Sequence, residues 1–296
     1  MPLKELQIEL TNACQAKCLM CSHRNMLRKV THMDLSLFEK VVNEAISLSQ
    51  EPYFVGICGV GEPLLHPQFT EALTIARRLP RLALGTNGQA LTEEKIQSLL
   101  SIGFDDLTLS LDAISPEVHS KMRPGLSFTI VLENVLNFFK ELRRIKRFWR
   151  TIYIQLILTN ENQFEMYSFI DYWLTKTQGI EGVVVFIKPM YQWPGLENPL
   201  YPGPKEEIIE RDRVLWGPIN EKTSFRDTCN LFDNWVMIQS DGSYQPCCMN
   251  IEDDFRVGNV KDNTILELYN SEVMNKYRGL FREKKFDQIP FCRGCK

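Results

Sequence analysis

The chain has 296 residues, 44% of them hydrophobic, and its 34 Lys and Arg nearly balance its 37 Asp and Glu, for a formal charge of −3. This apolar fraction excludes a disordered chain, and this charge gives no support for nucleic-acid binding. No run of about 18 apolar residues occurs and charged residues interrupt the first ten, so neither a transmembrane helix nor a signal peptide is expected. We therefore expect a cytoplasmic protein without a nucleic-acid or membrane partner.

Short apolar runs alternate with amphipathic segments through the first two thirds of the chain. The apolar and β-branched runs predict strands at 6–11, 53–58, 82–86, 106–111, 151–158 and 182–187. Apolar residues at helical spacing predict helices at 36–50, 67–79, 92–102, 116–122, 128–148 and 162–177, the first capped by Ser36 and the third by Thr92. Strands that alternate with helices in this way predict an α/β fold with a parallel sheet, either barrel-like or doubly wound.

The alternation stops near residue 188. Residues 188–218 are rich in proline and are expected to be loop with at most one acidic helix. The rest of the chain carries four clustered cysteines, as in small modules that a metal site stabilises because their own core is small. We expect two domains, 1–200 and 201–296.

Cysteine spacing gives the first chemical indication. An odd total of 9 cysteines without a secretion signal favours reduced thiols over a disulfide framework. The two groups with ligand-like spacing are Cys14, Cys18 and Cys21, and Cys229, Cys247, Cys292 and Cys295. Three thiolates leave one position open, which suits a catalytic zinc ion or a four-iron cluster with one free iron, whereas four thiolates suit a closed zinc site or a fully ligated cluster. Spacing alone does not separate these possibilities.

The loop from Cys14 to Cys21, with the pattern C-x3-C-x2-C, resembles the signature of the radical S-adenosylmethionine (SAM) superfamily. Other segments agree with this family in order and position: Gly61-Glu62-Pro63, the run 85–88 (Gly-Thr-Asn-Gly), Ser110 at the end of a strand, and Arg123-Pro-Gly. Met20 stands where many members of the family carry an aromatic residue. Together these segments cover roughly two thirds of the chain.

The resemblance implies a partial (β/α)6 TIM-type barrel, with a [4Fe–4S] cluster held by the first three cysteines at the C-terminal ends of the strands. SAM would bind the fourth iron and, after reduction, give a 5′-deoxyadenosyl radical that abstracts a substrate hydrogen. Gly61 would let the backbone approach the methionine end of SAM, Arg123 would bind the SAM carboxylate beside Ser110, and Gln155 would reach the ribose. The SAM-binding residues implied are Gly61, Glu62, Asn87, Ser110, Arg123 and Gln155.

The C-terminal part resembles the SPASM/twitch extension of the same superfamily. Gly242 lies in an Asp-Gly turn between two expected strands, and the pair Cys292–Cys295 ends the ligand set. Because no further cysteine follows that pair, we expect the shorter twitch form, a small α+β module with one auxiliary [4Fe–4S] cluster; a four-thiolate zinc site is the alternative. Two [4Fe–4S] clusters and SAM are therefore the expected cofactors.

These cofactors favour oxidation of a hydroxylated small molecule, such as a sugar or an aminocyclitol, with the auxiliary cluster accepting an electron and a flavodoxin or ferredoxin as electron donor. One alternative is an epimerase in which Cys248 returns a hydrogen atom to the substrate. Another is a maturase of a ribosomal peptide, and a third, outside enzymes, is an iron–sulfur sensor or a zinc-stabilised binding module. Cys58 is expected to be a small buried hydrophobic residue.

Overall fold

The computed structural model describes residues 3–48, 54–145, 149–190, 211–217, 229, 234–247, 251–252 and 257–292. Its strands are β1 (Glu5–Ile8), β2 (Phe54–Ile57), β3 (Leu82–Thr86), β4 (Asp106–Ser110), β5 (Thr151–Leu158), β6 (Val183–Pro189), β7 (Val214–Trp216), β8 (Trp235–Ile238) and β9 (Tyr244–Gln245). They form one nine-stranded sheet in the order β7-β6-β5-β4-β3-β2-β1-β8-β9. All neighbouring strands are parallel except β8 and β9, which are antiparallel.

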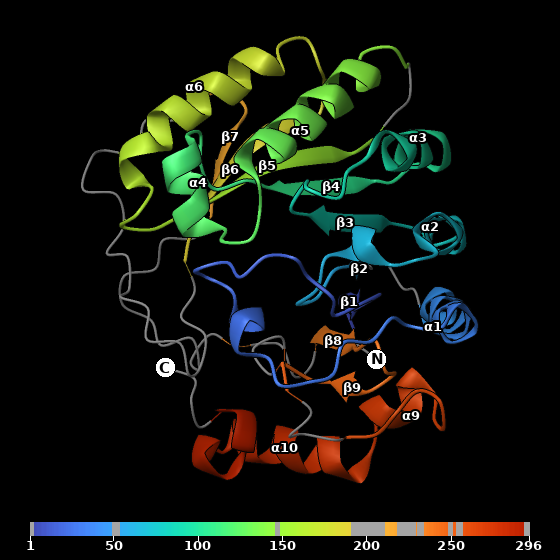
Figure 1. Ribbon diagram of the computed structural model, residues 1–296. Helices are drawn as coiled ribbons and strands as arrows, with labels where there is room; N and C mark the ends of the chain where they lie inside the picture. Colours follow the sequence, from blue (N-terminus) through green and yellow to red (C-terminus); the bar gives the residue numbers. More distant parts are fainter. Residues whose placement is uncertain are drawn as a thin grey trace.

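Helices cover one side of this sheet. They are α1 (Leu35–Leu48), α2 (Phe69–Ala76), α3 (Glu93–Ile102), α4 (Pro116–Met122), α5 (Phe128–Leu142), α6 (Met166–Lys176), α9 (Ile265–Tyr269) and α10 (Glu272–Arg282). Figure 1 shows α1, α2, α3, α5 and α6 following one another along the outside of the curved sheet, with α9 and α10 beside β8 and β9. This confirms the expected α/β fold with a parallel sheet, in the form of a partial barrel.

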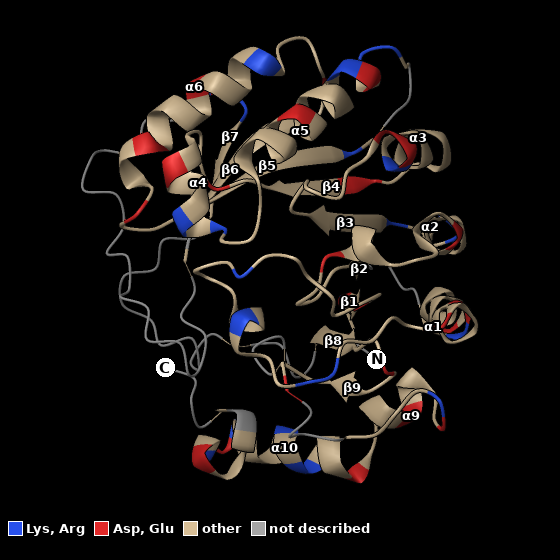
Figure 2. Cartoon of the chain, in the orientation of Figure 1, with Lys and Arg blue, Asp and Glu red and all other residues tan. Residues whose placement is uncertain are grey.

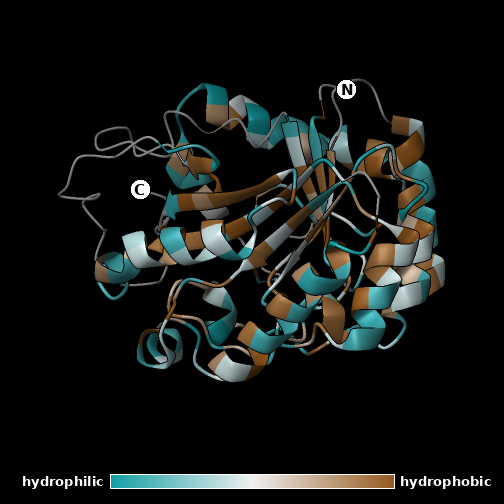
Figure 3. Cartoon of the chain, turned by 90° about the horizontal axis from the view of Figure 1, so that it is seen from above, coloured by the Kyte–Doolittle hydropathy of each residue, from teal (hydrophilic) through white to brown (hydrophobic). Residues whose placement is uncertain are grey.

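Alternate residues of each strand enter the core between the sheet and the helices. On β1, Leu6 and Ile8 are fully buried, and they pack in the same core as Phe38 and Val41 of α1. Glu5 and Gln7 point to the opposite, concave face, because successive side chains of a strand alternate. Figure 3 shows mostly hydrophobic strands flanked by helices in which hydrophilic and hydrophobic segments alternate. The outer face of the sheet thus builds the core, and the concave face is left for other uses.

All six expected strands are present, with ends shifted by up to three residues. The helix expected at 128–148 is wrong at its end: α5 stops at Leu142, and the N–H of Arg143 turns back to the carbonyls of Glu141 and Phe139. Ser36 is not the cap of α1, because the Asp34 carboxylate accepts the N–H of Ser36 at 2.8 Å. Thr92 does cap α3 as expected, by accepting the N–H of Lys95.

The loop expected over 188–218 is wrong in part, since the short run of β7 adds a strand to the edge of the sheet. Val214 pairs with Val185 of β6 in parallel register. Three apolar residues among prolines give too short a pattern to indicate a strand. At the other edge, β8 pairs with β1 in parallel, so the segment after residue 201 continues the barrel sheet. The boundary at residue 200 stays a prediction.

The C-terminal hairpin has the turn that the sequence indicates. Gly242 has φ of +91° and joins β8 to β9. Two helices follow, of which α9 begins with a reciprocal capping box between Thr264 and Glu267. Charges of both signs are mixed along α6 and α10 (Figure 2). None of the described helices has the length and apolar character needed to span a membrane.

Replacement of Gly242 by Ala should destabilise the protein more than replacement of Gly179. Both residues have positive φ, so each change introduces backbone strain of about 1–3 kcal/mol. A Cβ at Gly242 would also lie 2.5 Å from Oδ1 of Asn259, whereas nothing lies within 4 Å of one at Gly179. Urea denaturation of Gly242→Ala and Gly179→Ala measures the difference. Equal losses in the free energy of unfolding would show that the hairpin tolerates the contact.

Candidate active site

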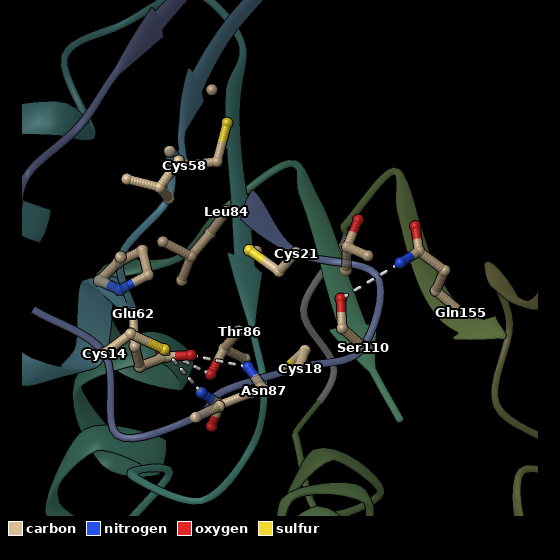
Figure 4. Close-up of a pocket in the computed structure, with 18 of the residues that line it drawn as sticks. Cys14, Cys18, Cys21, Cys58, Glu62, Leu84, Thr86, Asn87, Ser110 and Gln155 are labelled. Atoms are coloured by element: carbon tan, nitrogen blue, oxygen red, sulfur yellow. Dashed lines mark hydrogen bonds between the residues drawn. The ribbon is translucent and has the colours of Figure 1, made fainter. Parts of the chain in front are cut away.

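A cavity of about 480 Å³ opens on the concave face of the sheet. Figure 4 shows its wall, with the cysteines of the first group around one end and Cys58 toward the other. The structure brings together all nine residues that the sequence assigns to the first cluster and to SAM: Cys14, Cys18, Cys21, Gly61, Glu62, Asn87, Ser110, Arg123 and Gln155. Their individual roles stay predictions, but their common location is an observed property of the fold.

The cysteine loop lies across the end of α4 and the turn after it. The N–H of Lys17 donates to the Pro124 carbonyl at 2.7 Å, and the N–H of Leu19 donates to the Met122 carbonyl at 2.9 Å. Gly125, with φ of +94°, permits this approach, because a Cβ there would lie 2.4 Å from the carbonyl oxygen of Gln15. Backbone contacts therefore hold the loop in place independently of any group that the thiols bind.

The three cysteine thiols lie in surroundings that disfavour the charged thiolate unless a positive charge is close by. Burial raises the pKa of all three, that of Cys14 to about 12. The nearby Arg123 opposes this shift for Cys18, whose Sγ lies 3.6 Å from a guanidinium nitrogen. A metal site compensates such desolvation, because metal-bound thiols are deprotonated. Three thiols on one loop, directed into one cavity, fit a cluster that keeps one iron open to a ligand in that cavity.

Gly61 is also required by a close contact within the chain. A Cβ at this position would lie 2.0 Å from the carbonyl oxygen of Thr11 and 2.8 Å from Cα of Asn12. The residue therefore permits contact between the loop after β2 and the start of the cysteine loop, whatever it also does for SAM. The next N–H, that of Glu62, donates to the Ala13 carbonyl at 2.8 Å.

The Glu62 side chain joins this loop to the loop after β3. Glu62 is 2% exposed, and its carboxylate accepts from the Thr86 hydroxyl at 2.8 Å and from the N–H of Asn87 at 2.7 Å. Burial raises the pKa of Glu62, and these hydrogen bonds oppose the shift. With its carboxylate used in this way, Glu62 positions the Asn87 amide, whose Nδ2 lies 4.0 Å from Sγ of Cys14.

Arg123 forms a buried ion pair that the sequence does not indicate. Its guanidinium pairs with Asp112, whose side chain is fully buried and which has φ of +64°. The other carboxylate oxygen of Asp112 accepts the N–H of Ile157 at 2.7 Å. The guanidinium is thus fixed between Asp112 and Cys18. Nearby, Gln155 donates to the hydroxyl of Ser110 at 3.4 Å.

Two residues of the concave face were not identified as site residues. Cys58, expected to be a buried hydrophobic residue, is only half-buried and lines the cavity, so that expectation is wrong. Glu9 is fully buried and accepts both amino groups of Arg28 at 2.9 Å, and also the N–H and hydroxyl of Ser240. The alternation Glu5, Gln7, Glu9 against Leu6, Ile8 and Leu10 was the available signal for a polar inner face.

The second cysteine group is described only in part. Cys229 and Cys247 are half-buried and Cys292 is buried, whereas Cys295 and the candidate hydrogen donor Cys248 lie outside the described residues. Within the described ranges, no group of three or more His, Cys, Asp or Glu side chains is arranged to hold a single metal ion, and this includes Cys14, Cys18 and Cys21, each of which would bind a different iron of a four-iron cluster. The auxiliary ligand set stays a prediction.

Comparison with known proteins identifies the family. Residues 8–171, more than half of the chain, match the model of the radical SAM superfamily. The chain belongs to this superfamily. Residues 229–296 match the model of SPASM, an iron–sulfur cluster-binding domain. The radical SAM enzyme therefore uses a [4Fe–4S] cluster and SAM, and its C-terminal domain is of the kind that binds auxiliary iron–sulfur clusters.

Its relatives act on different substrates. It is 22% identical, over 99% of this chain and 87% of the relative, to the tungsten-containing aldehyde ferredoxin oxidoreductase cofactor-modifying protein of Pyrococcus furiosus. It is also 22% identical to the mycofactocin maturase MftC of Mycobacterium tuberculosis, over 85% of this chain and 66% of MftC.

Two solved structures share the fold. BtrN in complex with AdoMet and 2-DOIA matches with a TM-score of 0.59 and 15% identity, over 99% of this chain and 93% of BtrN. SuiB of Streptococcus suis bound to its precursor peptide SuiA matches with a TM-score of 0.72 and 13% identity, over 94% of this chain and 67% of SuiB. At these identities the likeness concerns the fold alone.

Replacement of Gly61 by Ala should weaken retention of the first cluster. The added Cβ cannot fit against the Thr11 carbonyl, so the cysteine loop must move, and changes that misplace metal ligands typically cost about ten-fold or more in affinity. Gly85→Ala is the matched control, because it faces the same cavity and its Cβ would contact nothing within 4 Å. Iron and sulfide per chain after anaerobic reconstitution measure the effect. Equal loading of both variants would contradict it.

Proposed function

We propose that this radical SAM enzyme oxidises a hydroxylated small molecule, of the sugar or aminocyclitol type, bound in the barrel cavity. The observation that supports this most is the location of the three thiols, the Glu62 loop and Arg123 around one cavity that also carries polar side chains further along the strands, among them Gln7 and Thr108. A few polar groups in a mostly apolar lining favour a substrate with matching polar groups, because they lose hydration unless the ligand supplies partners.

In this proposal Cys14, Cys18 and Cys21 hold the [4Fe–4S] cluster, and Cys229, Cys247, Cys292 and Cys295 hold an auxiliary one. When bound and reduced by a flavodoxin- or ferredoxin-type donor, these cofactors supply a 5′-deoxyadenosyl radical and an acceptor for one electron. The substrate carbinol loses a hydrogen atom from carbon, the hydroxyl proton and one electron, and so becomes a carbonyl. The organic chemistry belongs to the cofactors, and the protein supplies binding and orientation.

The residues of the chain position the reactants. Arg123, held by Asp112, offers a fixed cation for the SAM carboxylate, and its Nε has no hydrogen-bond partner in the described part of the chain. The loop of Gly61 and Glu62 faces the same space with backbone groups whose place is fixed by the contact with the cysteine loop. Gln155 and Ser110 supply neutral polar groups on the adjacent strands. A site fixed in this way needs little reorganisation during the reaction.

A second candidate is modification of a ribosomal peptide. The match to a maturase over 85% of this chain favours it, and SuiB, bound to a precursor peptide, has the same fold. The two candidates differ in what must reach the cavity, a whole small molecule or one side chain of a peptide.

Removal of the first three thiols should abolish SAM cleavage. A chain with Cys14→Ala, Cys18→Ala and Cys21→Ala should form 5′-deoxyadenosine only at the background level after reconstitution and reduction, because no ligands for the cluster remain. Cys58→Ala is the matched control, since this thiol lines the same cavity and directly follows β2. Chromatographic quantification of 5′-deoxyadenosine measures both. Cleavage by the triple variant, or its loss in the control, would contradict the assignment.

Replacement of Cys248 by Ala should separate oxidation from epimerisation. In a dehydrogenase the variant keeps its turnover, because no hydrogen returns to the substrate. In an epimerase the variant loses product, because the substrate radical has no S–H donor. Mass spectrometry of product formed in D2O measures this, and deuterium incorporated by the wild type but not by the variant would overturn the proposed oxidation.

A further inference from the structure

The interior of this barrel is hollow where closed barrels are filled. Closed barrels carry bulky branched side chains at the inward positions of their strands. Here the cavity is lined by small residues on three adjacent strands: Gly56 on β2, Ala83 and Gly85 on β3, and Thr108 and Ser110 on β4. A Cβ added at Gly85 would find no heavy atom within 4 Å. The space therefore continues along the strands, away from the cysteine loop.

This deep end of the cavity reaches the N-terminal ends of β1 and β2. Glu5 and Phe54, the first residues of these strands, both line it. Glu5 and Gln7 come from the same strand face, and the Gln7 amide donates to the Glu5 carboxylate at 2.7 Å. The deep end thus carries a carboxylate about four residues of strand length below the loops that hold the SAM motifs, or roughly 13 Å.

Glu5 differs from Glu9 and Glu62 in the partners that the described part of the chain gives its carboxylate. In the described residues, Gln7 is its one hydrogen-bond partner, and no Lys or Arg forms an ion pair with it. By contrast, the Glu62 carboxylate accepts three hydrogen bonds, and Glu9 is paired with Arg28. A carboxylate inside a cavity with a neutral amide as its partner is suited to a cationic ligand.

The surroundings of Cys58 show that other charged side chains lie near the deep end of the cavity. Desolvation of its thiol raises the pKa of Cys58 to about 12, the negative charges of Glu5 and Glu9 add to this shift, and Lys188 of β6 opposes it. Glu5 and Lys188 therefore act on the same point of the cavity from β1 and β6. Both side chains line the cavity, Glu5 from β1 and Lys188 from β6.

We infer that Glu5, supported by Gln7, binds a protonated amino group of the substrate at the deep end of the cavity. This inference rests on the proposed function, since it concerns the substrate of the same site. The shared chemistry is a primary ammonium group, which an amino sugar or aminocyclitol carries on its ring and a peptide carries on a lysine side chain. When Glu5 holds the ammonium group at the deep end, the amine points away from the radical and a neighbouring C–H bond of the substrate faces the SAM-binding end of the cavity.

The test compares charged and neutral probes on the anaerobically reconstituted full chain with SAM present. Glucosamine is paired with glucose, and Nα-acetyl-lysine amide with Nα-acetyl-norleucine amide, each by calorimetric titration. We expect one amine to bind about ten-fold or more tightly than its neutral analogue, as for a charge-assisted hydrogen bond. Which pair shows the preference distinguishes a small amine from a peptide side chain.

Substitutions at Glu5 test whether this residue causes the preference for amines. Glu5→Gln should lose it while neutral probes bind as before, and Glu5→Asp should restore part of it. Glu181→Gln, an exposed carboxylate in the turn before β6, is the matched control and should keep it. Formation of 5′-deoxyadenosine without substrate should be equal in all four proteins, because the residues around SAM are unchanged.

The outcomes separate this inference from the proposed function. Wild-type protein that cleaves SAM but does not prefer any amine, or a preference that survives in Glu5→Gln, overturns amine recognition and leaves the enzyme assignment intact. Wild-type protein that binds amines but forms no 5′-deoxyadenosine overturns the proposed function instead.

Discussion

The contact between Gly61 and the backbone of Thr11 determines where the cysteine loop lies relative to the sheet. Around it, the Glu62 N–H bonds to the Ala13 carbonyl, and the Glu62 carboxylate reaches the loop after β3. Loops from three strands are thereby fixed as one unit before any cofactor binds. Because the carboxylate is buried, its hydrogen bonds also satisfy a charge that would otherwise be costly, so the unit has one low-energy arrangement.

A second polar contact connects this unit to the C-terminal module. Glu9 follows β1, pairs with Arg28 beyond the cysteine loop, and accepts two hydrogen bonds from Ser240 in the β8–β9 turn. Removal of one partner of a buried ion pair typically costs about 3–5 kcal/mol, because the other charge stays buried. Together with the pairing of β8 and β1, this contact fixes the described part of the SPASM-type module against the cluster side of the barrel.

The sequence predicts the strands, most helices and the cavity cysteines because each depends on local signals. The β-branched strand patterns, the helix cap at Thr92 and the C-x3-C-x2-C loop can each be recognised from a few neighbouring residues. The ion pairs of Arg123 with Asp112 and of Glu9 with Arg28 join residues 11 and 19 positions apart through the fold, and no periodicity indicates them. The packing role of Gly61 likewise depends on a neighbouring loop. The three residues of β7 form a strand because they pair with β6, and a run that short gives no pattern of its own.

The inner face of β1 shows how one alternating pattern serves both structure and recognition. Glu5, Gln7 and Glu9 occupy alternate positions of the chain, and a buried apolar residue follows each of them. Glu9 is compensated by Arg28 and Ser240, so its charge is used for the fold. In the described part of the chain, Glu5 has the Gln7 amide as its one hydrogen-bond partner, and the small residues of β2 to β4 keep the space before it open. A carboxylate in a cavity whose charge no described side chain neutralises adds nothing to the stability of the fold, and this difference between Glu5 and Glu9 is the reason to look for the substrate at Glu5.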